Sequence, residues 1–117
     1  MIQRNFMIFN MAATANGTDD INMYRSDNLL AMDSTAAGVV TMYFRAWNEH
    51  VDAPDDIALT VTSSGDDNDD RINRLAAIDA MVDKANTINR QGYVVAYSEN
   101  ENVKPGGISS VAVTLDS

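Results

Sequence analysis

The five positions from Asp66 to Asp70 carry four aspartates and one asparagine, the densest group of potential metal ligands in the chain. Proteins bind calcium with several oxygen ligands held in a flexible loop, so we compared the run with an EF-hand loop. The pattern does not match, because the sixth position is Arg71 in place of glycine and the twelfth is Ala77 in place of glutamate. Carboxylates are also typical of the first turn of a helix, where they face unpaired N–H groups. We therefore interpret this run as a helix start and predict no metal there.

The single histidine, His50, lies near Glu49 and Asp52 in an acidic segment. Zinc binding or acid–base catalysis at His50 would need partners from distant segments. The chain contains no Gly-x-Ser-x-Gly, Gly-x-Gly-x-x-Gly or Walker sequence, and it has no cysteine. We interpret His50 as a solvated loop residue and expect no catalytic residues and no cofactor. A small hydrolase, in which two of the 17 acidic residues meet in a cleft, is the open alternative.

The 117-residue chain is acidic, with 17 acidic and eight basic residues and a formal net charge of −9. Its basic residues are spread along the sequence, and only Arg71 and Arg74 share a helical turn, which argues against nucleic-acid binding. No apolar run approaches the roughly 20 residues that span a bilayer. We expect neither nucleic acid nor a membrane as partner. Saline surroundings suit such a surface, because salt screens its self-repulsion.

The region from Ile57 to Tyr97 predicts how the domain folds. Ile57 to Val61 alternates apolar residues with alanine and threonine, which is typical of a strand with one buried face. From Asp69 to about Ile88 the pattern is that of an amphipathic helix, and strand alternation returns from Tyr93 to Tyr97. The apolar stripe of this helix consists of Leu75, Ile78, Met81, Val82 and Ala85. We predict one α+β domain over residues 1–117, in which a mainly antiparallel sheet packs one face on the helix.

Further strands are predicted on both sides of this region. The strongest pattern runs from Val39 to Trp47, and weaker ones cover Arg25 to Met32 and Ile108 to Leu115. The segment from Ile2 to Met11 is apolar on both faces and needs cover from elsewhere. It is either the first strand of the domain's own sheet or an N-terminal arm, within residues 1–20, that docks on a neighbouring subunit.

Five residues are predicted to contact other protein molecules. In the strongest of these strands, Tyr43, Arg45 and Trp47 alternate with the residues of the core face, and aromatic residues and arginine are enriched at interfaces. The alternative is that the same domain covers both faces of this strand. Phe6 and Phe9, from the first strand, complete the predicted interface.

Five short stretches of the sequence occur in an order that is also seen in a known group of proteins. They are GVVTMYF (38–44), IALTVT (57–62), RLAAI (74–78), QGYVVA (91–96) and PGGISSV (105–111). In these stretches the chain resembles small structural proteins encoded by marine tailed bacteriophages, over about residues 22–115. The aspartate run and the extended N-terminus depart from that pattern.

The resemblance implies a structural protein of the virion that decorates or cements the capsid, or another minor capsid protein. Its expected partners are the major capsid protein or other virion proteins, and copies of itself, with a trimer at capsid symmetry axes as one arrangement. No catalytic residues are carried over by the resemblance. The alternative is a tail or fibre adaptor, or another protein-binding module, that binds a host or partner protein.

Overall fold

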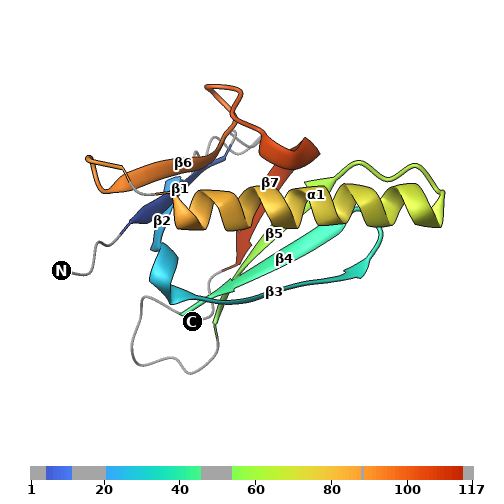
Figure 1. The fold of residues 1–117 in the computed structure, drawn as a ribbon, viewed down its shortest axis with the longest axis horizontal. Coiled ribbons are helices and arrows are strands. Elements are labelled where there is room, and N and C mark those ends of the chain that lie inside the picture. The colour runs from blue at the N-terminus through green and yellow to red at the C-terminus, as the bar shows by residue number, and fades with distance from the viewer. Residues whose placement is uncertain (1–4, 12–20, 46–53, 88, 115–117) are drawn as a thin grey trace.

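A computed structural model describes residues 5–11, 21–45, 54–87 and 89–114 of the chain. These residues form two sheets, a three-stranded sheet in the order β2-β1-β6 and a four-stranded sheet in the order β3-β4-β5-β7, and one long helix (Figure 1). The elements are β1 (Phe6–Asn10), β2 (Ile21–Arg25), β3 (Leu29–Ala36), β4 (Val39–Phe44), β5 (Asp55–Val61), α1 (Asp67–Asn86), β6 (Tyr93–Ser98) and β7 (Ile108–Thr114). The predicted α+β class is confirmed, although the expected single sheet is divided into two.

The four-stranded sheet is antiparallel throughout, and its two central strands are those with the clearest alternation in the sequence. Met42 of β4 lies opposite Ile57 of β5, and both side chains are fully buried. Their neighbours two residues away on either strand point to the same side and are also buried, as the period of two requires. The predicted core face of these strands is therefore confirmed.

The three-stranded sheet has β1 at its centre, antiparallel to β2 and parallel to β6. Phe6–Asn10 is thus a strand of the domain's own sheet and not an arm, whereas residues 1–4 and 12–20 lie outside the described part. The structure divides the segment predicted as one strand from Arg25 to Met32. Here β2 ends at Arg25, a 3-10 turn follows, and β3 continues from Leu29 through Ala36.

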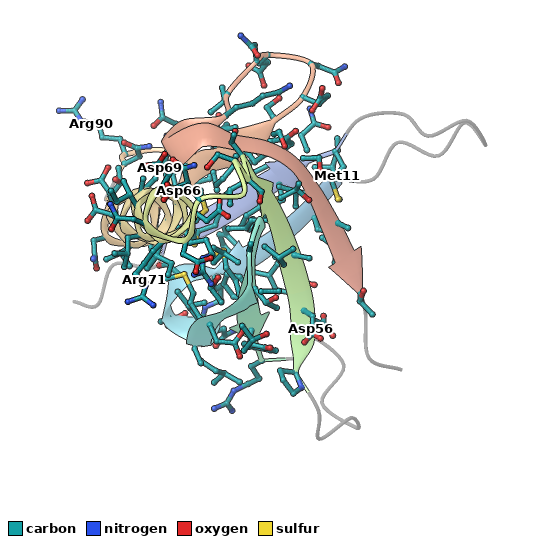
Figure 2. All side chains as sticks on the ribbon, turned by 90° about the vertical axis from the view of Figure 1, so that its right-hand side faces the viewer. Met11, Asp56, Asp66, Asp69, Arg71 and Arg90 are labelled. Carbon is teal, nitrogen blue, oxygen red and sulfur yellow. The ribbon has the colours of Figure 1, made fainter. Side chains whose placement is uncertain are left out.

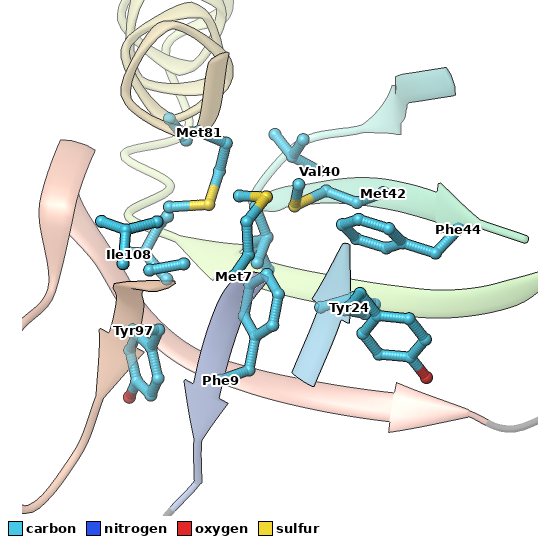
Figure 3. Packing of buried hydrophobic residues seen from close by; sticks show 14 of the residues in the cluster. Met7, Phe9, Tyr24, Val40, Met42, Phe44, Met81, Tyr97 and Ile108 are labelled. Carbon is cyan, nitrogen blue, oxygen red and sulfur yellow. The ribbon is translucent and has the colours of Figure 1, made fainter. Parts of the chain in front are cut away.

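The helix and the three-stranded sheet share one face of the four-stranded sheet, and the core lies between these three layers (Figure 3). Phe9 of β1 meets Phe44 of β4 edge to face, with ring centroids 6.2 Å apart. Tyr24 of β2 stacks on the same ring at 4.7 Å. Met81 points from α1 into the cluster beside Met7. Aromatic and methionine contacts therefore join the two sheets and the helix into one core.

The helix begins and ends two residues earlier than predicted and is rotated relative to the predicted stripe. Of the predicted stripe, Met81 is fully buried and Ile78 and Ala85 pack against the core, whereas Leu75 and Val82 are 58% and 40% exposed. Ala77 is fully buried in their place. The cause is the 3-10 turn Pro105–Gly107, which packs closely against the alanines of α1. Small residues, and not the largest apolar ones, therefore decide which side of the helix faces the core.

The predicted alternation in β6 is interrupted by a register shift opposite Ile8 and Phe9. Before the shift, Tyr93 and Val95 lie on the outer face of the sheet. After the shift, Tyr97 is turned into the core and is only 1% exposed. A bulge of this kind reverses the direction of the following side chains, so the three residues do not share one face.

Candidate interaction surfaces

The aspartate run is used in starting the helix. Asp66 is the N-cap residue, and its side chain accepts hydrogen bonds from the backbone N–H groups of Asn68 and Asp69 at 2.9 and 3.1 Å. The buried carboxylate of Asp70 accepts a hydrogen bond from the backbone N–H of Ser64 at 2.7 Å. The predicted helix start is confirmed, and two of these carboxylates are occupied by bonds to the chain itself.

The described residues hold no group of three or more histidine, aspartate or glutamate side chains placed to bind a metal ion. His50 lies outside the described part. In the same part of the chain, the helix is not long and apolar enough to cross a membrane.

Two buried tyrosines carry hydrogen bonds to acidic side chains. Tyr24 donates to the carboxyl group of the buried Asp55 at 2.8 Å, and burial together with this bond raises the pKa of Tyr24 well above its usual range. Burial and the hydrogen bond to Glu99 raise the pKa of Tyr97 to about 12. The pKa of Glu99 is lowered by its hydrogen bonds from Tyr97 and Lys104. Both tyrosines keep their protons at neutral pH and therefore serve as hydrogen-bond donors.

The predicted contact residues are distributed over different parts of the structure. Phe9 is fully buried against Phe44, so its assignment as a contact residue is wrong: the pleat of β1 turns it into the core. Trp47 lies outside the described residues. Tyr43 lies on the outer face of the four-stranded sheet and Phe6 on the outer face of the other sheet, and Arg45 is exposed directly after the end of β4.

The outer face of the four-stranded sheet carries mostly small or polar side chains. The hydroxyl of Tyr43 lies 3.2 Å from the carboxylate of Asp33, and Asp56 lies on the side of the sheet away from α1 (Figure 2). Along β5 and β7, the residues on this face are Ala58, Thr60, Ser110, Ala112 and Thr114. Carboxylates and hydroxyl groups of this kind are readily hydrated, and Val39, opposite Thr60, is the large aliphatic side chain exposed beside them.

Among the described residues, the outer face of the three-stranded sheet carries several exposed large apolar side chains. The register of the strands places nine residues on it. Ser98, opposite Asn10, is fully buried, and we call the other eight the β1 outer face: Phe6, Ile8, Asn10, Ile21, Met23, Arg25, Tyr93 and Val95. Ile21, Met23 and Tyr93 are 63%, 51% and 43% exposed. The β1 outer face contains no carboxylate, although the chain has a net charge of −9. Exposed apolar patches of this kind mark sites of interaction.

The sequence prediction found only Phe6 of this surface. The segment Ile21–Arg25 alternates Ile21, Met23 and Arg25 with Asn22 and Tyr24, which is a strand pattern. Its polarity is inverted, however, because the buried residue is Tyr24 and the exposed ones are apolar. The alternation was available as a signal, but only the partner strand β1 reveals which side faces solvent.

A second apolar surface is a groove of about 520 Å³ between α1 and β3. Leu75 and Ile78 of the helix and Met32 of β3 line it. Arg74 crosses the groove and donates to the backbone carbonyl of Ser34 at 3.2 Å. The carboxylate of Asp33 also lies in the groove wall, so the groove mixes apolar area with both signs of charge.

Comparison with known proteins gives no relative. No protein-family model, no curated protein sequence and no solved structure matches the chain.

Proposed function

We propose that this chain is a structural protein of a tailed-bacteriophage virion that decorates or cements the capsid through protein–protein contacts. The observation that supports this proposal is the β1 outer face, an apolar sheet surface without carboxylates on a strongly acidic domain. The sequence resemblance to small phage proteins supplies the virion as the setting. The partners are the major capsid protein or other virion proteins, together with further copies of the chain.

Both apolar area and charge favour association through the β1 outer face. Burying apolar surface stabilises an interface by about 25 cal/mol per Å² before the costs of association. An acidic chain is repelled by other acidic surfaces, and the repulsion is smallest where no carboxylate is present. The β1 outer face therefore combines exposed apolar area with the absence of carboxylates among its own residues. It offers contact area and no arrangement of reactive groups.

Mass spectrometry of purified virions tests the proposal. The protein is expected in intact particles at a fixed ratio to the major capsid protein. Particles assembled without it are expected to lose capsid density in electron micrographs or to break at a lower temperature. Complete absence of the protein from purified virions would contradict the proposal.

The tail or fibre adaptor is the second candidate, and separating capsids from tails distinguishes the two. A decoration protein remains with DNA-free capsids, whereas an adaptor remains with isolated tails. Recombinant protein added to empty capsids gives the same distinction by cosedimentation.

A further inference from the structure

The eight residues of the β1 outer face lie in rows across the sheet. Phe6 of β1 lies opposite Arg25 of β2 and opposite Tyr93 of β6, so these three side chains form one row. Ile8 lies opposite Met23 and Val95 and forms the next row. Each row runs from β2 across β1 to β6. The first row therefore carries a cation at one edge, an aromatic ring at the other, and an aromatic ring between them.

We propose that the β1 outer face binds the same face of a second copy of this chain, forming a symmetric dimer. A two-fold axis parallel to β1, lying between the two sheets, places β2 of each copy over β6 of the other. Arg25 then lies over the second copy's Tyr93, and Phe6 lies over its own counterpart. Sheets packed face to face are about 10 Å apart and roughly aligned, which suits side chains of this size.

The chemistry of the first row is self-complementary under this symmetry. An arginine over a tyrosine ring is a favourable cation–π pair, and the two-fold axis produces it twice. Arg25 holds Asp27 at 2.7 Å, and its side chain is 31% exposed. An ion pair made in the plane of the guanidinium group leaves the group able to stack on a ring. The Nε atom of Arg25 is buried, so the ring of the second copy would contact the exposed remainder of the side chain.

Charge favours this surface over the alternatives for self-association. A second copy brings its own net charge of −9, so surfaces that contain carboxylates repel each other when they are paired with themselves. The outer face of the four-stranded sheet carries Asp33 and Asp56, and the groove beside α1 has Asp33 in its wall. The β1 outer face has one charged residue, Arg25, whose charge is paired with the neighbouring Asp27, and the symmetry places Arg25 away from its own copy.

This inference rests on the proposed function, because both use the same face, but it is tested separately. Sedimentation velocity over a concentration series is expected to show a monomer–dimer equilibrium for the full chain. Met23→Asp places a carboxylate in the apolar second row and is expected to weaken the dimer by about tenfold or more. Leu30→Asp is the matched control, because Leu30 is 55% exposed on β3, outside this face. It is expected to leave the dimer unchanged.

A pair of substitutions at Tyr93 tests the orientation of the two copies. Tyr93→Glu faces Arg25 of the second copy with an opposite charge, whereas Tyr93→Lys faces it with a like charge. The Glu variant is expected to dimerise about tenfold or more tightly than the Lys variant. Net charge alone predicts that the Lys variant dimerises more tightly, since the Glu variant is the more acidic protein and repels its own copy more strongly.

A wild-type chain that stays monomeric at all concentrations would overturn the inference, as would a dimer that Met23→Asp leaves intact. Equal or reversed affinities of the two Tyr93 variants would overturn the pairing of Arg25 with Tyr93. A monomeric chain that binds capsids, and loses this binding with Met23→Asp, would assign the face to another virion protein. If the chain forms the dimer but is absent from virions, the proposed function is contradicted and the dimer inference is retained.

Discussion

Two tyrosine–aspartate hydrogen bonds in this protein have similar chemistry and different surroundings. Tyr24 and Asp55 are buried and connect the three-stranded sheet to the four-stranded sheet. Tyr43 and Asp33 lie on the outer face, where water can replace either partner. Removing a donor from a buried acceptor costs the desolvation of that acceptor, whereas an exposed acceptor is simply hydrated. The two pairs therefore differ in their contribution to stability.

Tyr24→Phe is expected to lower the free energy of unfolding by about 1–3 kcal/mol, because it removes the hydroxyl that donates to the buried carboxyl group of Asp55. Urea denaturation at neutral pH measures the change. Tyr43→Phe is the matched control and is expected to leave the urea midpoint nearly unchanged. Similar losses in the free energy of unfolding for the two variants would show that burial of the hydrogen bond does not determine its contribution to stability.

The pKa of Tyr97 predicts how stability depends on alkaline pH. Its pKa is raised from 10.0 to about 12 in the folded protein, so the folded state holds the proton more tightly than the unfolded chain. This contribution to stability is complete below pH 10 and is lost as the pH rises from 10 to about 12. Denaturation measured across that range is expected to show a falling free energy of unfolding.

Tyr97→Phe removes the titrating group and is expected to make this decline shallower. A residual decline is expected, because the pKa of Tyr24 is also raised. A variant with the same alkaline decline as the wild type would contradict the assignment to Tyr97.

At the scale of elements, the contact between α1 and the turn Pro105–Gly107 fixes the rotation of the helix. Gly106 has a positive φ of 64°, and a Cβ atom added to it would lie 2.8 Å from the carbonyl oxygen of Ala76 and 2.9 Å from the Cβ of Ala80. Any larger residue in the turn would push the helix away. The position of the buried face of α1 therefore depends on a glycine about 30 residues further along the chain.

Gly106→Ala is expected to destabilise the fold more than Gly107→Ala does. Both glycines have positive φ values, so both substitutions incur the cost of the left-handed conformation, about 1–2 kcal/mol. Only the alanine at position 106 also meets the helix, and this overpacking adds about 1–3 kcal/mol. Thermal or urea denaturation of the two variants measures the difference. Equal losses would show that the turn is not in tight contact with α1.

At the scale of the whole molecule, charge is the dominant property. The net charge of −9 on a chain of 117 residues favours expansion, because like charges repel one another in the compact state. Salt screens this repulsion over about 8 Å at physiological ionic strength. We therefore expect an acidic domain of this kind to be more stable in saline surroundings.

The melting temperature is therefore expected to rise as sodium chloride is added. Measurement at low protein concentration keeps association out of the result. The variant Asp79→Asn with Asp83→Asn, which removes two charges from the solvent side of α1, is expected to show a smaller rise. A melting temperature that is flat or falls with added salt would contradict this expectation.

Local patterns of residues were enough to predict the class of the fold and most of its elements. Strict alternation from Val40 to Phe44 and from Ile57 to Val61 is sufficient to predict strands with one buried face, because the period of two is a property of the backbone. The start of α1 was equally predictable, since the cap at Asp66 is a local interaction. The strand β1 was also located, although its environment was left open.

Which apolar residues remain on the surface depends on contacts between distant parts of the chain. Leu75 and Val82 are exposed because a distant glycine turn rotates the helix, and Tyr97 is buried because a bulge shifts the register of β6 against β1. Likewise, the β1 outer face exists only because three segments, around residues 8, 23 and 95, pair side by side. The local pattern specifies how side chains alternate, but the pairing of distant segments determines which face is covered.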